Sequence, residues 1–111
     1  MIEEIKMLVA IIIIAVIAVV AVKTLNNSSQ NNKINTLMES ANQGDSYSQY
    51  ELGHYYFFTA HDIDNAVYWL VLSEANGNPQ ATALIQQMIN AGAPRIHERI
   101  ENAKANIYAN Q

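Results

Sequence analysis

The run from Met7 to Val22, MLVAIIIIAVIAVVAV, constrains this chain more than any other feature of its sequence. It contains no charged residue, no glycine and no proline. At ~1.5 Å per residue a helix of this length falls a little short of a bilayer core of ~30 Å, but Lys6 and Lys23 can snorkel to the two interfaces. A single span in lipid must be helical, because every backbone group needs an internal partner. We therefore expect an uncleaved transmembrane anchor in residues 1–25.

Two other interpretations of the apolar run compete with an anchor. A cleaved signal peptide needs a basic start and a small-residue cleavage site. Here Glu3 and Glu4 outnumber Lys6, and Val19-Val20-Ala21 is a tolerable cleavage site, not a good one. A buried core helix is disfavoured because the rest of the chain is too small to surround it. The lysines near the two ends are almost balanced, so the positive-inside rule does not decide the orientation.

Composition excludes several classes of function. The chain has 111 residues, which allow one compact domain at most. The absence of cysteine excludes disulfide scaffolds, thiolate metal sites and cysteine nucleophiles. The net charge is −4, and the segment from Ile34 to Pro94 has six carboxylates and no lysine or arginine. This acidic balance argues against a nucleic-acid binder, which needs basic surface for phosphate.

Residues 26–33 separate the apolar run from the rest of the chain. Residues 26–32 read NNSSQNN, which offers no apolar side chain to bury. Such a composition predicts a flexible polar linker. We expect the folded domain to comprise residues 34–111.

The domain is expected to be all-α, because its apolar residues follow the helical period and no segment alternates like a strand. Capping residues and glycines divide it into short helices. The expected helices run from Ile34 to Gly44, from Asp45 or Ser46 to about Thr59, from the N-cap Asp62 to Gly77, from Asn78-Pro79 to Gly92, and over residues 95–109, opened by Pro94. Four residues form an apolar stripe on the last helix: Ile96, Ile100, Ala103 and Ile107.

A repeat pattern runs through the first helices of the domain. It reads Ala41-x-x-Gly44-x-x-x-Ser48-Gln49-x-x-Leu52-Gly53-x-x-Tyr56, then Asp62-x-x-x-Ala66-x-x-Trp69, then Gly77-x-x-x-Ala81. The pattern resembles the Sel1-like repeat, a relative of the tetratricopeptide repeat, over a little more than one third of the chain. This resemblance implies a short α-solenoid of antiparallel helix pairs. It departs from the family at Ser48 and at Ser73-Glu74, where alanines are usual, and a second repeat after Ala81 degrades.

The repeat residues are expected to serve packing, with small side chains admitting close helices and large ones filling the gaps. This set comprises Ala41, Gly44, Leu52, Gly53, Tyr56, Ala66, Trp69, Gly77 and Ala81. Repeat arrays need about three stacked units. Since this chain has fewer, the last helix either caps the stack or leaves an apolar edge for a partner or a second copy.

An aromatic cluster on the expected second helix of the domain exceeds the needs of the repeat. The candidate partner-binding residues are Tyr47, Tyr50, His54, Phe57 and Phe58. This face can be buried entirely by packing against neighbouring helices. Alternatively the face forms the floor of a groove for a partner's helix or extended segment, because the resemblance implies that the first helix of each pair lines a concave surface. The acidic residues would then favour a basic segment.

Catalysis finds little support in the sequence. The histidines are His54, His61 and His97, and their spacing matches no metal-site motif. Nothing buries Glu51 and Asp62 together as an acid–base pair. There is no glycine-rich phosphate loop and no nucleophile elbow. We expect no enzyme activity, no cofactor and no metal.

The function expected from these features is a membrane-anchored protein–protein interaction adaptor or scaffold of a bacterial envelope complex. The membrane would be engaged by residues 2–25, and partners of a secretion or other envelope machine fit the resemblance. The resemblance also suggests a single-pass protein of the inner membrane with a periplasmic domain, and a homo-oligomer is compatible with it. The alternative is a small structural membrane subunit whose transmembrane helix makes the main contacts.

Overall fold

The structure, a computed structural model, describes residues 2–110, and for residues 18–28 it describes the backbone alone. The described chain is α-helical, and residues 2–110 contain no strand. The helices are α1 (Ile2–Asn42), α2 (Ser46–Phe58), α3 (Ile63–Ala75), α4 (Pro79–Asn90) and α5 (Ile96–Ala109). The chain divides into two compact units between Lys33 and Ile34, so α1 contributes to both units.

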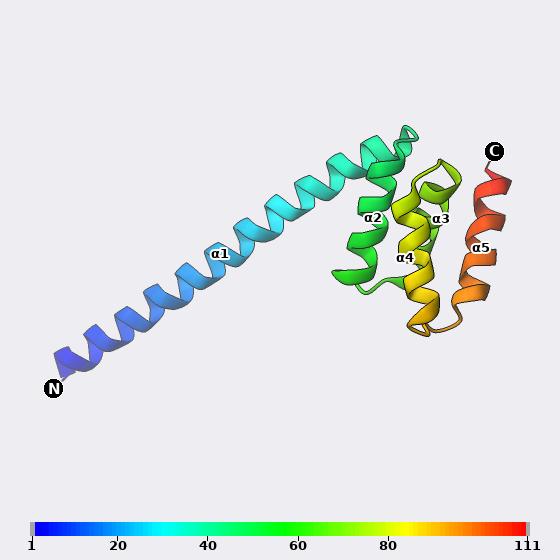
Figure 1. The fold of residues 1–111 in the computed structure, drawn as a ribbon. Helices are drawn as coiled ribbons and strands as arrows, with labels where there is room; N and C mark the ends of the chain where they lie inside the picture. Colours follow the sequence, from blue (N-terminus) through cyan, green and yellow to red (C-terminus); the bar gives the residue numbers. More distant parts are fainter. Residues whose placement is uncertain (1, 111) are drawn as a thin grey trace. The chain divides into compact units, whose positions relative to one another are not determined.

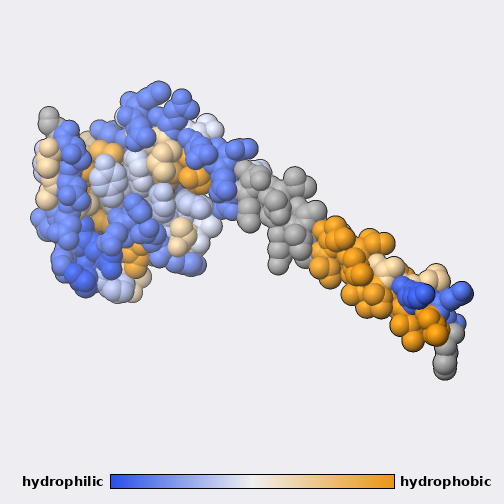
Figure 2. Space-filling view, turned by 180° about the vertical axis from the view of Figure 1, so that it is seen from behind, coloured by the Kyte–Doolittle hydropathy of each residue, from blue (hydrophilic) through white to orange (hydrophobic). Residues whose placement is uncertain are grey.

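The first unit contains the apolar run, and its side chains from Ile2 to Ile17 are all exposed. Figure 2 shows this stretch as a largely hydrophobic surface, with a hydrophilic patch toward its N-terminal end. Within the described part of the chain, no helix combines the length and the apolar character that a membrane crossing requires. The transmembrane anchor predicted for residues 1–25 is therefore contradicted. The described apolar side chains from Met7 to Ile17 account for only about 16 Å of helix rise, against ~30 Å for a bilayer core. Residues 18–25 of the predicted anchor lie outside the residues whose side chains are described.

Residues 26–33, where composition predicts an irregular linker, are helical and belong to α1. Asparagine and serine cost a helix only some tenths of a kcal/mol per residue. Extending an existing helix adds one hydrogen bond per residue, whereas starting a new one is costly. Local composition therefore failed to predict the backbone state of this segment.

Three of the helices in the second unit begin at side-chain caps. Asp45 accepts a hydrogen bond from the backbone N–H of Ser48 at 3.2 Å, and Asp62 accepts one from Asn65 at 3.1 Å. Asn78 caps α4, which starts with Pro79. The caps predicted at Asp62 and Asn78 are confirmed.

The last helix begins differently from the sequence expectation. α5 starts at Ile96, two residues after Pro94, and no side chain caps it. Arg95 adopts a left-handed backbone conformation with φ +54° and binds Glu98 through two hydrogen bonds of 2.6 and 2.9 Å. Glu98 in the first turn is favourable at the positive end of the helix dipole.

The helices α2 to α5 form two successive antiparallel pairs (Figure 1). α2 and α4 run in one direction, while α3 and α5 run in the opposite direction. α3 is the central helix, because its contacts with α2, α4 and α5 are the most extensive between helices of this unit. Its sequence explains this position, since its buried residues spread around much of its circumference: Ala66, Val67, Trp69, Leu70, Val71 and Ser73. A helix that is apolar over most of its surface must be enclosed by neighbours.

Two hydrophobic clusters share α3. One joins α3 to α4 and α5, and the other includes Ala41 of α1, Leu52 of α2 and Trp69 of α3. On α5, Ile96, Ala103 and Ile107 are buried and Ile100 packs against the core. The last helix thus closes the core at its C-terminal end, and the alternative of an apolar edge on this stripe is not observed.

The residues of the repeat pattern lie at close approaches and turns. Ala41, Leu52, Gly53, Ala66, Trp69 and Ala81 are buried, and Tyr56 is half-buried. Gly44 and Gly77 adopt φ values of +94° and +90° in the turns that follow α1 and α3. At Gly53, an added Cβ would lie 2.6 Å from the Cγ and Cδ2 atoms of Leu70. Only glycine lets α2 approach α3 this closely.

Buried polar side chains connect the elements of the second unit. The Gln49 amide donates to the carbonyl of Ala41 at 3.0 Å and accepts from Asn76 at 2.9 Å. The Ser73 hydroxyl donates to the carbonyl of Ser46 at 2.6 Å. An alanine at position 73 could not make this bond.

The capping carboxylates predict how stability depends on pH. Hydrogen bonds from Ser48 lower the pKa of Asp45, and hydrogen bonds from Asn65 lower the pKa of Asp62. Because folding lowers both pKa values, the two carboxylates stabilise the fold above the pKa of the unfolded chain. That contribution is lost as the pH falls below about 4. Asparagine also caps helices but does not titrate there.

We expect the Asp45→Asn/Asp62→Asn double variant to match the wild-type stability at neutral pH and to lose less stability in acid. Urea unfolding followed by Trp69 fluorescence across this pH range measures the difference. Parallel pH profiles of the two proteins would contradict this role of the caps.

Candidate functional site

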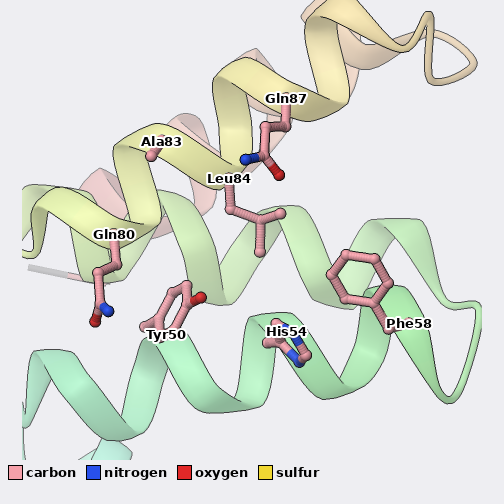
Figure 3. Close-up of a pocket in the computed structure, with 7 residues that line it drawn as sticks. All are labelled: Tyr50, His54, Phe58, Gln80, Ala83, Leu84 and Gln87. Atoms are coloured by element: carbon pink, nitrogen blue, oxygen red, sulfur yellow. The ribbon is translucent and has the colours of Figure 1, made fainter.

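A groove lies between α2 and α4, with a volume of about 240 Å³. Its lining consists of Tyr50, His54 and Phe58 from α2 and Gln80, Ala83, Leu84 and Gln87 from α4. We call this the α2–α4 groove. Figure 3 shows Gln80 at the end near Tyr50 and Gln87 at the end near Phe58. The two helices run in the same direction, so residues early in each helix meet at one end.

The α2 wall of the groove is an aromatic stripe. Tyr50, His54 and Phe58 are each four residues apart, which places them on one face of a helix. The ring centroids of Tyr50 and His54 lie 6.1 Å apart, and those of His54 and Phe58 lie 4.5 Å apart. Phe58 keeps 50% of its surface exposed. The stripe therefore presents ring surface to solvent that a partner can cover.

The α4 wall combines an apolar floor with two carboxamides. Leu84 is buried and Ala83 is exposed beside it. Gln80 and Gln87 are exposed and lie one heptad apart. Among the residues that the structure describes, their side-chain amides have no hydrogen-bond partner. Each amide is free to donate and accept bonds from a ligand in the groove.

The structure brings together three of the five predicted partner-binding residues. Tyr50, His54 and Phe58 line the α2–α4 groove, whereas Phe57 is half-buried and packs against the core. Tyr47 is 56% exposed and lies outside the groove lining. The negative charge of Glu51 and a hydrogen bond to its carboxylate raise the pKa of Tyr47.

The α4 residues of the groove were missed in the sequence. Gln80, Ala83, Leu84 and Gln87 recur at intervals of three, four and seven, the spacing of one helical face. Glutamine and alanine side chains carry no distinctive chemical signal. These α4 residues can be recognised as part of a groove only once α4 is placed beside the aromatic residues of α2.

Charge is distributed unevenly around the groove. No aspartate, glutamate, lysine or arginine lines the groove, and α4 contains none of these four residue types. On α2 the charged residue is Glu51. One ion pair connects two other helices, since Arg99 of α5 contacts Asp64 of α3. The acidic character expected to attract a basic segment is therefore absent from the groove lining.

The histidines form no metal site in the described part of the chain. Residues 2–110 contain no group of three or more histidine, aspartate or glutamate side chains that could hold an ion. His54 lies between two aromatic rings in the groove, where it contributes a flat, partly polar surface.

A second hollow of about 160 Å³ lies between α3 and α5. Its lining is Val71, Glu74, Ala75, Lys104, Ile107 and Tyr108. It is smaller than the α2–α4 groove and includes charged side chains of both signs.

Comparison with known proteins gave no match to a family model, to a curated protein or to a solved structure.

Proposed function

We propose that this chain is a protein–protein interaction module, an adaptor or scaffold, which binds a partner in the α2–α4 groove. The observation that carries the proposal is the aromatic stripe of Tyr50, His54 and Phe58. Within residues 34–110, the large hydrophobic side chains that stand exposed are Tyr47, Phe58 and Tyr108. Two of these three lie on α2. Aromatic rings left at a groove are typical anchors for a protein partner.

The arrangement of the helices supports this proposal. α2 and α4 are the first helices of two successive antiparallel pairs, and they line one groove together. In a Sel1-like solenoid, as the repeat pattern suggests, this is the concave side. The resemblance, and the envelope complex expected from it, stay predictions.

The dimensions of the groove favour a macromolecular partner over a small molecule. Pockets for drug-sized ligands usually enclose about 300–1,000 Å³. The α2–α4 groove has about 240 Å³ and is open along the exposed residues His54, Ala83 and Gln87. A segment of a partner can lie along such a groove while the rest of the partner stays outside.

The experiment that tests this function is site-specific photo-crosslinking in cells. A photoreactive amino acid replaces Ala83 in the groove of the full chain, and in a matched control it replaces Asn102, which is exposed on α5. We expect discrete crosslinked products from position 83 and not from position 102. Equal products at both positions, or none at position 83, would contradict the proposal. Mass spectrometry of the products identifies the partner.

A further inference from the structure

The α2–α4 groove lies on an unusually uncharged face. About 25% of the residues in a typical soluble domain are charged. α4 has none in Pro79–Asn90, although most of its residues are exposed. The charged residues of α3 and α5 are Asp64, Glu74, Glu98, Arg99, Glu101 and Lys104. Charge is thus concentrated on α3 and α5, and a partner in the groove would contact almost no charged side chains.

The polar groups of the groove include two carboxamides of matching chemistry, beside the Tyr50 hydroxyl and the His54 imidazole. A primary amide carries donors and an acceptor, the same pair that a peptide group presents. Gln80 and Gln87 are seven residues apart, which corresponds to about 10.5 Å along the helix axis. An extended chain advances about 3.4 Å per residue, so the same distance spans three residues. An extended segment lying along α4 therefore presents peptide groups to both glutamines.

We infer that the occupant of the α2–α4 groove is an uncharged segment of a partner protein in extended conformation. Gln80 and Gln87 bond its backbone, and its side chains cover the rings of the aromatic stripe. A helical segment uses its own N–H and C=O groups internally and offers few to the glutamines. This inference rests on the proposed function and adds the chemistry of the partner. Because no ion pair forms in the groove, the affinity changes little with salt.

The test is selection of short random peptides on the immobilised full chain, followed by affinity measurements on the enriched peptides. The wild type is compared with the Gln80→Leu/Gln87→Leu variant. Gln86→Leu is the matched control, since Gln86 is an exposed glutamine of the same helix outside the groove lining. We expect the enriched peptides to have no net charge and dissociation constants that are nearly independent of sodium chloride. The Gln80→Leu/Gln87→Leu variant should bind them roughly tenfold more weakly than the wild type, and the Gln86→Leu control should bind them as the wild type does.

Four results would overturn the inference: basic peptides whose binding weakens with salt, peptides that are helical when bound, equal binding to the double variant and the control, or no enriched peptide. None of them decides the proposed function, which depends on crosslinking at Ala83. Conversely, uncharged extended peptides that bind without crosslinking of a cellular partner would support the chemistry of the groove and count against the adaptor role.

Discussion

Replacing Leu70 by alanine is expected to lower the free energy of unfolding by about 2–5 kcal/mol. Leu70 is 0% exposed and lies on α3, the helix that contacts α2, α4 and α5. Truncating it removes apolar contacts and leaves a cavity that rigid neighbouring helices fill only in part. Urea unfolding of the full chain, followed by the fluorescence of the adjacent Trp69, measures the loss.

The Gly53 position gives this prediction a sharp control. In the wild type, Gly53→Ala is expected to destabilise the protein, because its Cβ would lie 2.6 Å from Leu70 side-chain atoms. In the Leu70→Ala background those atoms are gone, and alanine in a helix is favoured over glycine by about 1 kcal/mol. The carbonyl oxygen of Ala66 still lies 3.3 Å from the added Cβ, so the destabilisation by Gly53→Ala should become much smaller in this background. The same destabilisation in both backgrounds would contradict the close approach of α2 and α3.

Replacing His54 and Phe58 together by alanine is expected to weaken binding of the crosslinked partner by roughly thirtyfold or more, equivalent to about 2 kcal/mol. Both side chains are exposed in the α2–α4 groove, and their ring centroids lie 4.5 Å apart. Tyr50 is left in place because it also packs against the core. Titration calorimetry with the purified partner measures the change, and circular dichroism verifies that the helices are retained.

Local chemistry made the helix starts of the second unit predictable. Asp62 and Asn78 accept hydrogen bonds from backbone N–H groups within a few residues of themselves, and Pro79 removes an N–H that would have no partner in the helix. These effects do not depend on the rest of the fold. The start of α5 was predicted to within one residue, although Arg95, in a left-handed conformation, precedes it without a side-chain cap. Pro94 predicts where a helix can begin, not the backbone conformation of the residue that follows it.

The first 33 residues show where composition misleads. The apolar run predicted a membrane anchor, and the polar residues 26–33 predicted an irregular linker. The first prediction was contradicted, and the second segment is helical. A hydropathy or composition argument adds up the properties of the residues in a window. Whether a given residue is helical also depends on whether an existing helix already extends to it.

The groove was predictable in one half only. The spacing of Tyr50, His54 and Phe58 on one helix is a property of the local sequence. The distinction between Phe57 and Phe58 depends on how α2 is rotated against α3, which tertiary packing decides. Gln80 and Gln87 join the aromatic stripe only because α4 returns beside α2, a contact between distant segments of the sequence.

The most direct test of the groove as the partner-binding surface compares two aromatic truncations in one affinity measurement. The His54→Ala/Phe58→Ala variant removes rings from the groove, whereas Tyr108→Ala removes a ring on α5 that is 70% exposed. We predict a dissociation constant for the partner that rises roughly thirtyfold or more with the groove variant and stays near the wild-type value with Tyr108→Ala. Equal dissociation constants for the wild type and the groove variant, or a loss of affinity confined to Tyr108→Ala, would contradict the groove as the partner-binding surface.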